Sequence, residues 1–581
     1  MELEITMSNI GHNSYGPQIQ ACDDLHAQKY RLPNESFNEA CARQAGAMSD
    51  DDEHRSAFKK ILLNQRYMPA GRVQAAMGSP KNVTAYNCFV SGTIRDSMDS
   101  IMDKAKEAAE TMRRGGGIGF DFSRIRPRND RIVSLDSSAS GPVSFMAIFD
   151  SVCNTIVSAG HRRGAMMAVL RVDHPDIEEF IRAKKDSTTL TNFNVSVGVT
   201  DEFMDCVAKK KMFNLEFEGR VYQSVDAAAL WDEIMRNNWD WAEPGVLFLD
   251  RINDDNNLQY AETIEATNPC GEQPLPPYGA CLLGSFNLVK YMYRGNQHKD
   301  YYSFDYQQFK MDIPNVVRAM DNVIDRTQYP LVAQEKEAKA KRRMGLGITG
   351  LANVLTLLGI KYGSPEAVRV TRKITKTLMC GTYETSAILA KEKGPFPLYT
   401  EEYHDSKFIQ RLPLDIQDLI KRYGIRNSHL TSIAPTGTIS FTADNISSGV
   451  EPVFSNQLDR TVQTEQGPII VPLKDYVYNT YGLRNVEADD LSTDDHLDMQ
   501  IAVQPFVDSA VSKTINVSDK VTFDEFKDIY MKAWKGKLKG CTTFRLAGKR
   551  YGILNKVEPL EEPIEGAACF IDPATGNKEC G

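Results

Sequence analysis

The chain has 581 residues, which is too long for one ordinary core, although a large α/β barrel can exceed the usual domain size as a single unit. Its composition, 42% hydrophobic and 25% charged, excludes a fibrous or disordered protein. A formal net charge of -9 argues against nucleic-acid binding, and no stretch approaches the roughly 20 apolar residues of a membrane helix. Since the segment Met1 to Tyr15 also lacks a secretion signal, we expect a cytoplasmic protein without membrane or nucleic-acid partners.

The cysteines of the chain predict chemistry rather than a scaffold. There are 11, too few for a disulfide framework at this length, and none forms a CxxC pair. Zinc-ribbon and thioredoxin-like sites therefore have no spacing to support them. We expect thiols, and no metal ion held by protein side chains.

The first part of the chain, residues 1–85, alternates polar turns with short helical stretches and predicts a helical N-terminal region. Pro69 and Gly71 interrupt the segment Met68 to Arg72, which predicts a loop there. From Asn87 onward, short apolar runs such as Cys88 to Val90 alternate with helical patterns. That alternation predicts an α/β architecture.

Three helices stand out by their apolar spacing and their end signals. Between Asp96 and Arg114 the apolar residues recur at helical intervals, and three glycines then end the helix and predict a glycine-rich loop. A second helix is expected over residues 316–327. A third should begin at Ser364-Pro365 and end at Gly394-Pro395. The predicted buried positions are Ile101, Ala105, Ala108 and Met112 in the first helix, and Val316, Met320, Val323 and Ile324 in the second.

The end of the chain differs from the rest. Residues 557–581 are rich in Pro, Glu, Gly and Ala, show little apolar periodicity and include Cys569 and Cys580. This composition predicts a mobile tail that carries thiols. We therefore divide the chain into a helical region at 1–85, a large α/β domain at 86–550 and a redox-active tail at 551–581.

The segment at residues 268–288 reads NPCGEQPLPPYGACLLGSFNL. Its prolines argue against a helix or a central strand, so Cys270 should lie on a rigid loop that presents polar groups. Taken alone, Cys270 would more often be a buried, inert thiol, because free cysteine is among the most buried residue types.

This segment closely resembles the cysteine finger loop of ribonucleotide reductases, in the form typical of the class II, adenosylcobalamin-dependent family. The resemblance runs from about Met68 to Arg545 and is carried in family order by AYNCFVSG, GGGIGFDFSRIRP, SGPVSFM, GHRRGAMMAVLRVDHPDIEEFI, RRMGLGITGLA, IAPTGTISFTADNISSGVEP, VDSAVSKTINV and KGCTTFR. It implies a ten-stranded α/β barrel with a central cysteine finger loop, preceded by a small helical region. It also implies reduction of ribonucleoside diphosphates, with adenosylcobalamin as the cofactor.

The resemblance assigns roles to five residues. Cys270 matches the cysteine whose thiyl radical abstracts the 3′-hydrogen of the ribose. This step is reversible because the S–H and the activated C–H bonds are similar in strength. Glu272 matches the general base for the 3′-hydroxyl, and Asn268 its hydrogen-bonding partner. Cys88 and Cys281 match the pair that supplies two electrons, so their Cα atoms must lie within about 7 Å. Without the resemblance, Cys88 would be a strand-core residue, and the polar pair would stabilise a turn.

The tail thiols Cys569 and Cys580 match the pair that reduces the active-site disulfide, and they in turn need a thioredoxin- or glutaredoxin-like reductant. They stand further apart than the closely spaced tail cysteines of the family. The alternative is a frayed terminus with incidental thiols.

Two further segments match nucleotide sites. The family binds the substrate diphosphate with the segment matching Ala434, Pro435, Thr436, Gly437 and Thr438, a combination that can also start a helix. The basic loop Gly160, His161, Arg162, Arg163 and Gly164 matches the loop that transmits the identity of a deoxynucleotide effector bound at a homodimer interface. His161 replaces the expected lysine. Asp96 matches the residue that holds the effector sugar, and it could also be a helix N-cap.

The source of the radical is predicted from Thr542 and Thr543 in KGCTTFR, where class I enzymes have two adjacent tyrosines. Threonine cannot relay a radical as a phenol can, so class II is favoured over a class I chain that needs a second subunit. The tail lacks the glycine motif of class III, and the N-terminal region is short for an ATP cone, so no overall activity switch is expected. A non-catalytic nucleotide-binding relative is the remaining alternative, and the complete set of five residues argues against it.

Overall fold

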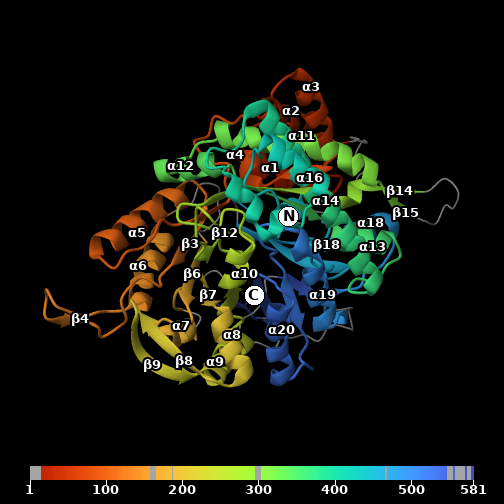
Figure 1. Ribbon diagram of the computed structural model, residues 1–581. Coiled ribbons are helices and arrows are strands. Elements are labelled where there is room, and N and C mark those ends of the chain that lie inside the picture. The colour runs from red at the N-terminus through yellow and green to blue at the C-terminus, as the bar shows by residue number, and fades with distance from the viewer. Residues whose placement is uncertain are drawn as a thin grey trace.

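The computed structural model in Figure 1 describes residues 15–156, 165–185, 188–294, 302–464 and 467–545, with three short strands beyond them, β21 (Leu554–Lys556), β22 (Cys569–Ile571) and β23 (Lys578–Cys580). The centre is a ten-stranded sheet in the order β1-β13-β2-β3-β6-β7-β10-β20-β19, with β16 paired to β13. The strands are β1 (Tyr67–Pro69), β2 (Cys88–Val90), β3 (Gly117–Asp121), β6 (Met166–Arg171), β7 (Phe193–Val199), β10 (Gly245–Phe248), β13 (Ala280–Asn287), β16 (Met344–Thr349), β19 (Thr514–Val517) and β20 (Gly540–Arg545).

Most neighbouring strands are parallel, and only the pairs β1 with β13, β2 with β13 and β10 with β20 are antiparallel. The sheet continues beyond β16 through backbone hydrogen bonds to residues 429–433, including Met344 N to His429 O at 3.0 Å. The same segment bonds to residues 509–512, which directly precede β19, for example through Ile433 N to Ala510 O at 3.1 Å. Hydrogen bonds therefore lead from β16 toward the strand at the other end of the sheet. The predicted number of strands and the α/β class are confirmed.

The helices pack on this sheet as Figure 1 shows, with the N-terminal helices at one end and α8, α9 and α20 at the other. The N-terminal set is α1 (Gln20–Tyr30), α2 (Phe37–Met48), α3 (Asp52–Leu63) and α4 (Gly71–Ala76). The others are α5 (Met98–Arg113), α6 (Pro142–Thr155), α7 (Ile177–Arg182), α8 (Asp201–Lys209), α9 (Ala227–Trp241), α10 (Leu249–Asp254), α11 (Tyr306–Arg326), α12 (Val332–Lys341), α13 (Leu351–Leu357), α14 (Pro365–Lys393), α15 (Lys407–Gln410), α16 (Leu414–Tyr423), α17 (Gly437–Phe441), α18 (Tyr476–Tyr481), α19 (Thr493–Val503) and α20 (Phe523–Lys535).

Smaller strands form separate hairpins. They are β4 (Arg131–Ile132) with β5 (Ser137–Ser138), β8 (Met212–Phe217) with β9 (Arg220–Asp226), β11 (Ala266–Thr267) with β12 (Pro274–Leu275), and β14 (Met292–Arg294) with β15 (Tyr302–Phe304). A three-stranded sheet joins β17 (Gln457–Thr464), β18 (Gly467–Lys474) and β21. No helix in the described ranges combines the length and the apolar character needed to span a membrane.

Three sequence predictions of helices are confirmed. In α5 the predicted face, Ile101, Ala105, Ala108 and Met112, is buried. Helix α14 starts after Ser364, whose side chain accepts from Ala367 N, and ends at Gly394. Helix α11 contains the predicted segment but begins already at Tyr306, with Pro314 in its interior.

Other local predictions are wrong. Tyr67–Pro69 forms strand β1 rather than a loop, and Gly71 starts α4. Pro69 is tolerated because β1 pairs on one side only, with β13. The glycine-rich loop predicted after α5 is present but short, since Gly115 turns the chain with φ +96° and Gly117 already begins β3.

The largest correction concerns the proline-rich cysteine segment. Its second half, Ala280–Asn287, is the fully buried central strand β13. A strand is possible there because the prolines that argued against one all precede it.

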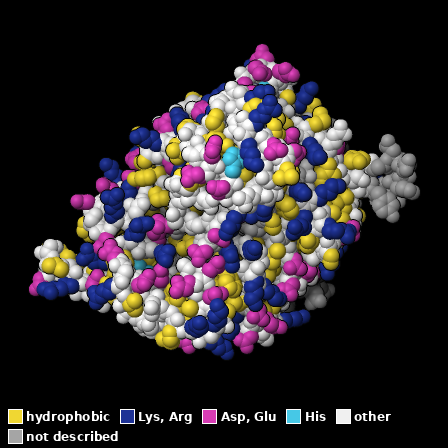
Figure 2. All heavy atoms as spheres, viewed as in Figure 1, with side chains coloured by type: hydrophobic (Ala, Val, Ile, Leu, Met, Phe, Trp, Pro, Cys, Tyr) yellow, Lys and Arg dark blue, Asp and Glu magenta, His cyan; other side chains and the backbone are white. Residues whose placement is uncertain are grey.

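Basic and acidic side chains are interspersed over the face of the molecule seen in Figure 2.

Candidate active site

The cysteine loop is the turn of a short hairpin between β11 and β12. Asn268 closes the turn, since its Oδ1 accepts from Gln273 N at 2.9 Å and its backbone N–H donates to Gln273 O at 3.1 Å. Gly271 N donates to Asn268 O at 3.0 Å, and Gly271 has φ +78°, a conformation that favours glycine. The order Asn, Pro, Cys, Gly, Glu, Gln thus specifies a tight turn with Cys270 at its tip.

Glycines in the sheet make room for this hairpin. A Cβ on Gly119 of β3 would lie 1.8 Å from Thr267 O, and one on Gly345 of β16 would lie 2.5 Å from Gln273 Nε2. A side chain at either position would collide with the hairpin, which therefore lies directly against the sheet.

Hydrogen bonds from separate segments hold the turn. Asn194 Nδ2 donates to Pro269 O at 2.8 Å from β7. Glu272 O accepts from Ala510 N at 3.0 Å and from Ser432 Oγ at 2.9 Å. The loop is fixed through its backbone, which leaves the side chains of Cys270 and Glu272 to be positioned by it.

The five predicted catalytic residues come together at this turn. Cys88 in β2 and Cys281 in β13 are direct partners across an antiparallel pair. Such partners have Cα atoms roughly 4.5–5.5 Å apart, within the range that a disulfide requires. Asn268 Nδ2 donates to Cys88 Sγ at 3.2 Å, and Cys88 Sγ donates to Glu272 Oε1 at 3.8 Å.

The protonation of the pair follows from its surroundings. Burial raises the pKa of the Cys88 thiol well above its ordinary value, and the nearby Glu272, Cys281 and Cys270 raise it further. Burial also raises the pKa of Cys281. Both are free thiols and buried, whereas Cys270 is exposed, so one open thiol stands beside a protonated, buried dithiol.

The predicted phosphate segment lies close to the turn. Ser432, which bonds to Glu272 O, is two residues before Ala434. Thr436 precedes α17 with φ 54°, and its Oγ1 accepts from Gly449 N at 2.8 Å. A Cβ on Gly437 would meet nothing within 4 Å, so the start of α17 faces open space.

The effector residues are described only in part. Asp96 is not the N-cap of α5, because Ser97 fills that position and accepts from Ser100 N. Asp96 instead pairs with Arg126, whose Nε lies 2.5 Å from Asp96 Oδ2. The loop from Gly160 to Gly164 lies outside the described residues.

The remaining predicted residues lie in strands. In β20, Thr542 is exposed, while Thr543 is buried and donates to Asn238 Oδ1 at 2.6 Å. In the tail, β22 pairs antiparallel with β23 in a register that places Cys569 opposite Cys580. The spacing in sequence therefore does not separate the backbones of these two residues.

Several residues near the turn were not predicted from the sequence. Asn194 and Ser432 hold the loop, and Arg343 lies fully buried just before β16. The only available signal was that Arg343 lies within a matched segment and Ser432 directly precedes one. Their contacts could not be predicted, because they come from strands far apart in the chain.

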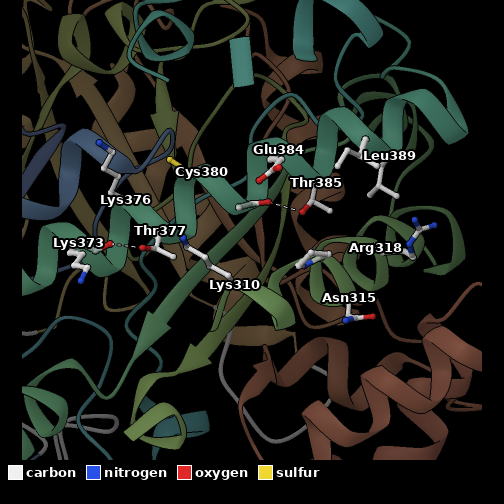
Figure 3. A pocket seen from close by; sticks show the side chains of 13 residues that line it. Lys310, Asn315, Arg318, Lys373, Lys376, Thr377, Cys380, Glu384, Thr385 and Leu389 are labelled. Atoms are coloured by element: carbon white, nitrogen blue, oxygen red, sulfur yellow. Dashed lines mark hydrogen bonds between the residues drawn. The ribbon is translucent and has the colours of Figure 1, made fainter. Parts of the chain in front are cut away.

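A separate cavity of about 530 Å³ lies between α11 and α14. Figure 3 shows that its lining includes Lys310, Lys376, Cys380 and Glu384, and none of the predicted site residues contributes to it. Within the described ranges, no group of three or more His, Cys, Asp or Glu side chains is placed to hold a metal ion.

Comparison with known proteins gives a consistent result. Residues 86–544 match the family described as "Ribonucleotide reductase, barrel domain". The chain is 36% identical to the vitamin B12-dependent ribonucleoside-diphosphate reductase of Mycobacterium tuberculosis, over 92% of this chain and 79% of that protein. It is 35% identical to the protein of the same name from Thermoplasma acidophilum, over 86% and 66%. It is also 30% identical to the vitamin B12-dependent ribonucleotide reductase of Streptomyces clavuligerus, over 85% and 60%.

Proposed function

The chain belongs to the ribonucleotide reductase family, and from this premise we propose how its own residues carry out the reaction. It is a vitamin B12-dependent enzyme that reduces ribonucleoside diphosphates to 2′-deoxyribonucleoside diphosphates. The observation that carries the proposal is the convergence of Asn268, Glu272, Cys88 and Cys281 around the Cys270 turn.

Cys270 is the residue that takes the 3′-hydrogen atom from the ribose and returns it at the end. Its side chain is exposed at the tip of a turn whose backbone is held from β7 and from residues 432 and 510. A radical centre has to stay at one distance from the sugar, and a loop fixed through its backbone provides this.

Glu272 accepts the proton of the 3′-hydroxyl, and Asn268 orients the neighbouring groups. Glu272 is buried, with 2% of its surface exposed, and its Oε1 lies beside Cys88 Sγ. The Asn268 amide donates to the same sulfur. Base and reductant therefore share one side of the turn.

Cys88 and Cys281 supply the two electrons. Replacement of the 2′-hydroxyl by hydrogen, with loss of water, consumes two electrons and two protons. The two thiols supply them when they form one S–S bond. Their position as direct cross-strand partners supports this role, because the bond can form without moving either strand.

The surroundings of Cys270 fit a cofactor that approaches from outside. A Cβ on Gly271 would meet nothing within 4 Å, so the space beside the exposed Cys270 is open. Asn194, which bonds to Pro269 O, is exposed as well. Adenosylcobalamin, when bound, supplies the radical that oxidises the Cys270 thiol. A class I radical relay would need a tyrosine at the position of Thr543. This threonine instead forms hydrogen bonds with Asn238 and Tyr530, which does not support such a relay.

The segment Ala434 to Thr438 holds the substrate diphosphate. A Cβ on Gly437 would meet nothing within 4 Å, so a phosphate group has access to the start of α17. Its connection to Glu272 through Ser432 supports a single substrate that contacts both segments.

Regulation and partners complete the proposal. A deoxynucleotide effector binds near Asp96 and the loop from Gly160 to Gly164, at a homodimer interface. The outer side of α5 supports this, since Met98 and Met102 are 56% and 48% exposed there. Cys569 and Cys580, opposite each other in β22 and β23, reduce the active-site disulfide and are recycled by a thioredoxin- or glutaredoxin-like protein. The nine cysteines within residues 15–545 are free thiols, which fits a cytoplasmic location.

We propose the three-part division made from the sequence, with a helical region at 1–85, the reductase barrel at 86–550 and the tail at 551–581. The family match over residues 86–544 supports the central boundary. Strand β1 belongs to the first region by its residue numbers, but it pairs with β13 and so contributes to the sheet of the central domain.

The test is product formation by the purified full-length chain. Cytidine diphosphate, dithiothreitol and a deoxynucleotide are incubated with the chain, with and without adenosylcobalamin. Deoxycytidine diphosphate should form only with the cofactor and without any second protein. Product without cobalamin, or product from C270A, would overturn the proposal.

A further inference from the structure

The reductive dithiol has two different sides. Cys88 retains 5% of its surface exposed and Cys281 retains none. Cys88 faces the turn, where Asn268 and Glu272 contact its sulfur. Cys281 lies between β2 and β16 within the sheet.

The neighbour of Cys281 on the far side is Arg343. Cys281 and Arg343 directly precede Leu282 and Met344, the first paired residues of the parallel strands β13 and β16. The Arg343 guanidinium is 2% exposed and pairs with Glu262 and with Glu337, the latter at 3.0 Å. Cys88 in β2, Cys281 in β13 and Arg343, which immediately precedes β16, thus follow one another across the sheet.

A cation influences only one of the two sulfurs. Around Cys281, burial is the largest influence on the pKa and raises it, and the Arg343 charge is the strongest influence that lowers it, against weaker opposition from Asp508 and Glu272. Around Cys88 every charged neighbour raises the pKa, and only the Asn268 hydrogen bond lowers it. The one cation that favours a thiolate among these influences therefore acts on Cys281 and not on Cys88.

From this asymmetry we propose that the Cys88–Cys281 disulfide is reduced by attack on Cys88, with Cys281 leaving as a thiolate that Arg343 stabilises. This inference rests on the proposed function of the pair. Arg343 acts through Cys281 and is a positioning residue. Both features of the structure favour the same direction, because the more accessible sulfur is attacked and the sulfur nearer to the cation leaves.

The step balances as an ordinary thiol–disulfide exchange. A tail thiolate gives its electron pair to a new bond with Cys88 Sγ. The Cys88–Cys281 bond breaks, and its electron pair stays on Cys281, which then takes up a proton. The second tail thiol, as its thiolate, attacks the tail sulfur of the mixed disulfide. Cys88 leaves as a thiolate and takes up the second proton, one having come from each tail thiol, so the tail is oxidised to a disulfide and the site is reduced to two thiols.

The first test maps the attacked sulfur and uses a chain in which C569S and C580S remove the tail thiols. The reduced chain is given cytidine diphosphate and adenosylcobalamin for one turnover, and the deoxynucleotide formed is measured. Glutathione is then added, free thiols are alkylated at acid quench, and peptides are mapped by mass spectrometry. We expect glutathione on Cys88 and the alkyl group on Cys281, by at least tenfold over the reverse.

The two proposals fail differently in this experiment. Absence of deoxynucleotide in the first turnover contradicts the proposed function. One equivalent of product, followed by glutathione on Cys281 or equally on both sulfurs, contradicts the inference alone.

The second test measures the role of Arg343. In R343Q, reduction of the disulfide by glutathione should slow about tenfold, since a leaving thiol of higher pKa leaves more slowly. R343K keeps the charge and should retain most of the rate. A merely structural role predicts the opposite, because a loosened site would admit glutathione faster. Equal rates for R343Q and R343K would therefore overturn the role of the charge.

Discussion

Cys270 is exposed and Cys380 is half-buried in a different region of the molecule, and of these two only Cys270 is surrounded as a catalytic residue would be. Cys270 lies at a turn that is held by hydrogen bonds from β7 and from residues 432 and 510. Cys380 is half-buried on α14 beside a cavity of about 530 Å³, between Lys310 and Lys376 (Figure 3). The cavity is the more conspicuous feature, yet its lining comes from just two helices.

The difference teaches that convergence identifies the site better than cavity volume does. Around Cys270, a base, an amide and a dithiol arrive from three separate segments, and all are buried. Around Cys380, the cavity is lined by charged, polar and apolar side chains from two helices, and no such cluster of buried polar groups is described there. The predictions below use the second region as a control for the first.

The largest difference is expected between C270A and C380A. C270A removes the only group proposed to carry the radical, so deoxynucleotide formation should become undetectable. C380A should keep its rate within about twofold, because surface changes away from a site are usually small. The measurement is deoxycytidine diphosphate formed per chain. A strong loss in C380A would give the cavity a catalytic role and break the comparison.

The next effect concerns the carboxylates Glu272 and Glu384. E272Q keeps the shape but removes the base, so kcat should fall by roughly 10²–10⁴-fold, the usual contribution of general acid–base catalysis. E384Q changes the exposed carboxylate at the cavity and should leave kcat unaltered. Steady-state assays at saturating substrate provide the comparison. Equal activity of E272Q and the native chain would remove the proposed base.

Glycine substitutions test the fit of the hairpin. G119A places a Cβ 1.8 Å from Thr267 O, a backbone atom that cannot rotate away, so the turn should shift and activity should fall at least tenfold. In G381A the new Cβ lies 2.9 Å from Ile313 Cδ1, the end of a flexible side chain. Overpacking costs of about 1–3 kcal/mol apply to G119A, and thermal unfolding should show the larger loss there. Similar loss in both variants would mean that the hairpin yields easily.

The pH dependence of alkylation distinguishes the two regions under native conditions. Burial raises the pKa of Cys88 and of Cys281 well above the thiol range, whereas Cys380 is only half-buried and its lysine neighbours oppose the rise. Because the thiolate reacts, modification of Cys380 by iodoacetamide should increase between pH 7 and pH 9, while Cys88 and Cys281 stay unmodified. Peptide mapping measures each site. Rapid labelling of Cys88 at pH 7 would contradict its buried, protonated state.

The smallest effect is expected for S432A. The variant removes one of the two hydrogen bonds to Glu272 O and leaves the bond from Ala510 N. A loss of about 1 kcal/mol corresponds to roughly a fivefold lower kcat with little change in stability. Rescue by S432T would support a positioning role, since threonine keeps the hydroxyl. An unchanged rate in S432A would assign the position of Glu272 to Ala510 alone.

Local signals in the sequence predicted what depends on nearest neighbours. The apolar spacing in α5, and the Ser-Pro start and Gly end of α14, specify these helices without tertiary contacts. The prolines located the Cys270 turn correctly. Strand β13, which follows them, was missed. A strand that is buried on both sides has no alternation of polar and apolar residues by which the sequence could show it.

What could not be predicted depends on contacts between distant segments. Arg343 is a charged residue in a matched segment, and nothing in its neighbours indicates that it lies beside Cys281. Asp96 had the position of a helix cap, but Arg126 offers its carboxylate a stronger partner and Ser97 caps the helix. The order of strands in the sheet decides such pairings, and the sequence shows only which residue types are available for them.

The cross-strand position of Cys88 and Cys281 also has a consequence for heat resistance. When the pair is oxidised, one covalent bond closes a loop that spans residues 88–281 and joins the first strand of the barrel domain to the strand beyond the cysteine turn. Closing a loop of this length restricts the unfolded chain by about 5 kcal/mol in the chain-entropy description. The enzyme should therefore melt at a higher temperature just after it has made product, and return to a softer state each time its thiols are restored.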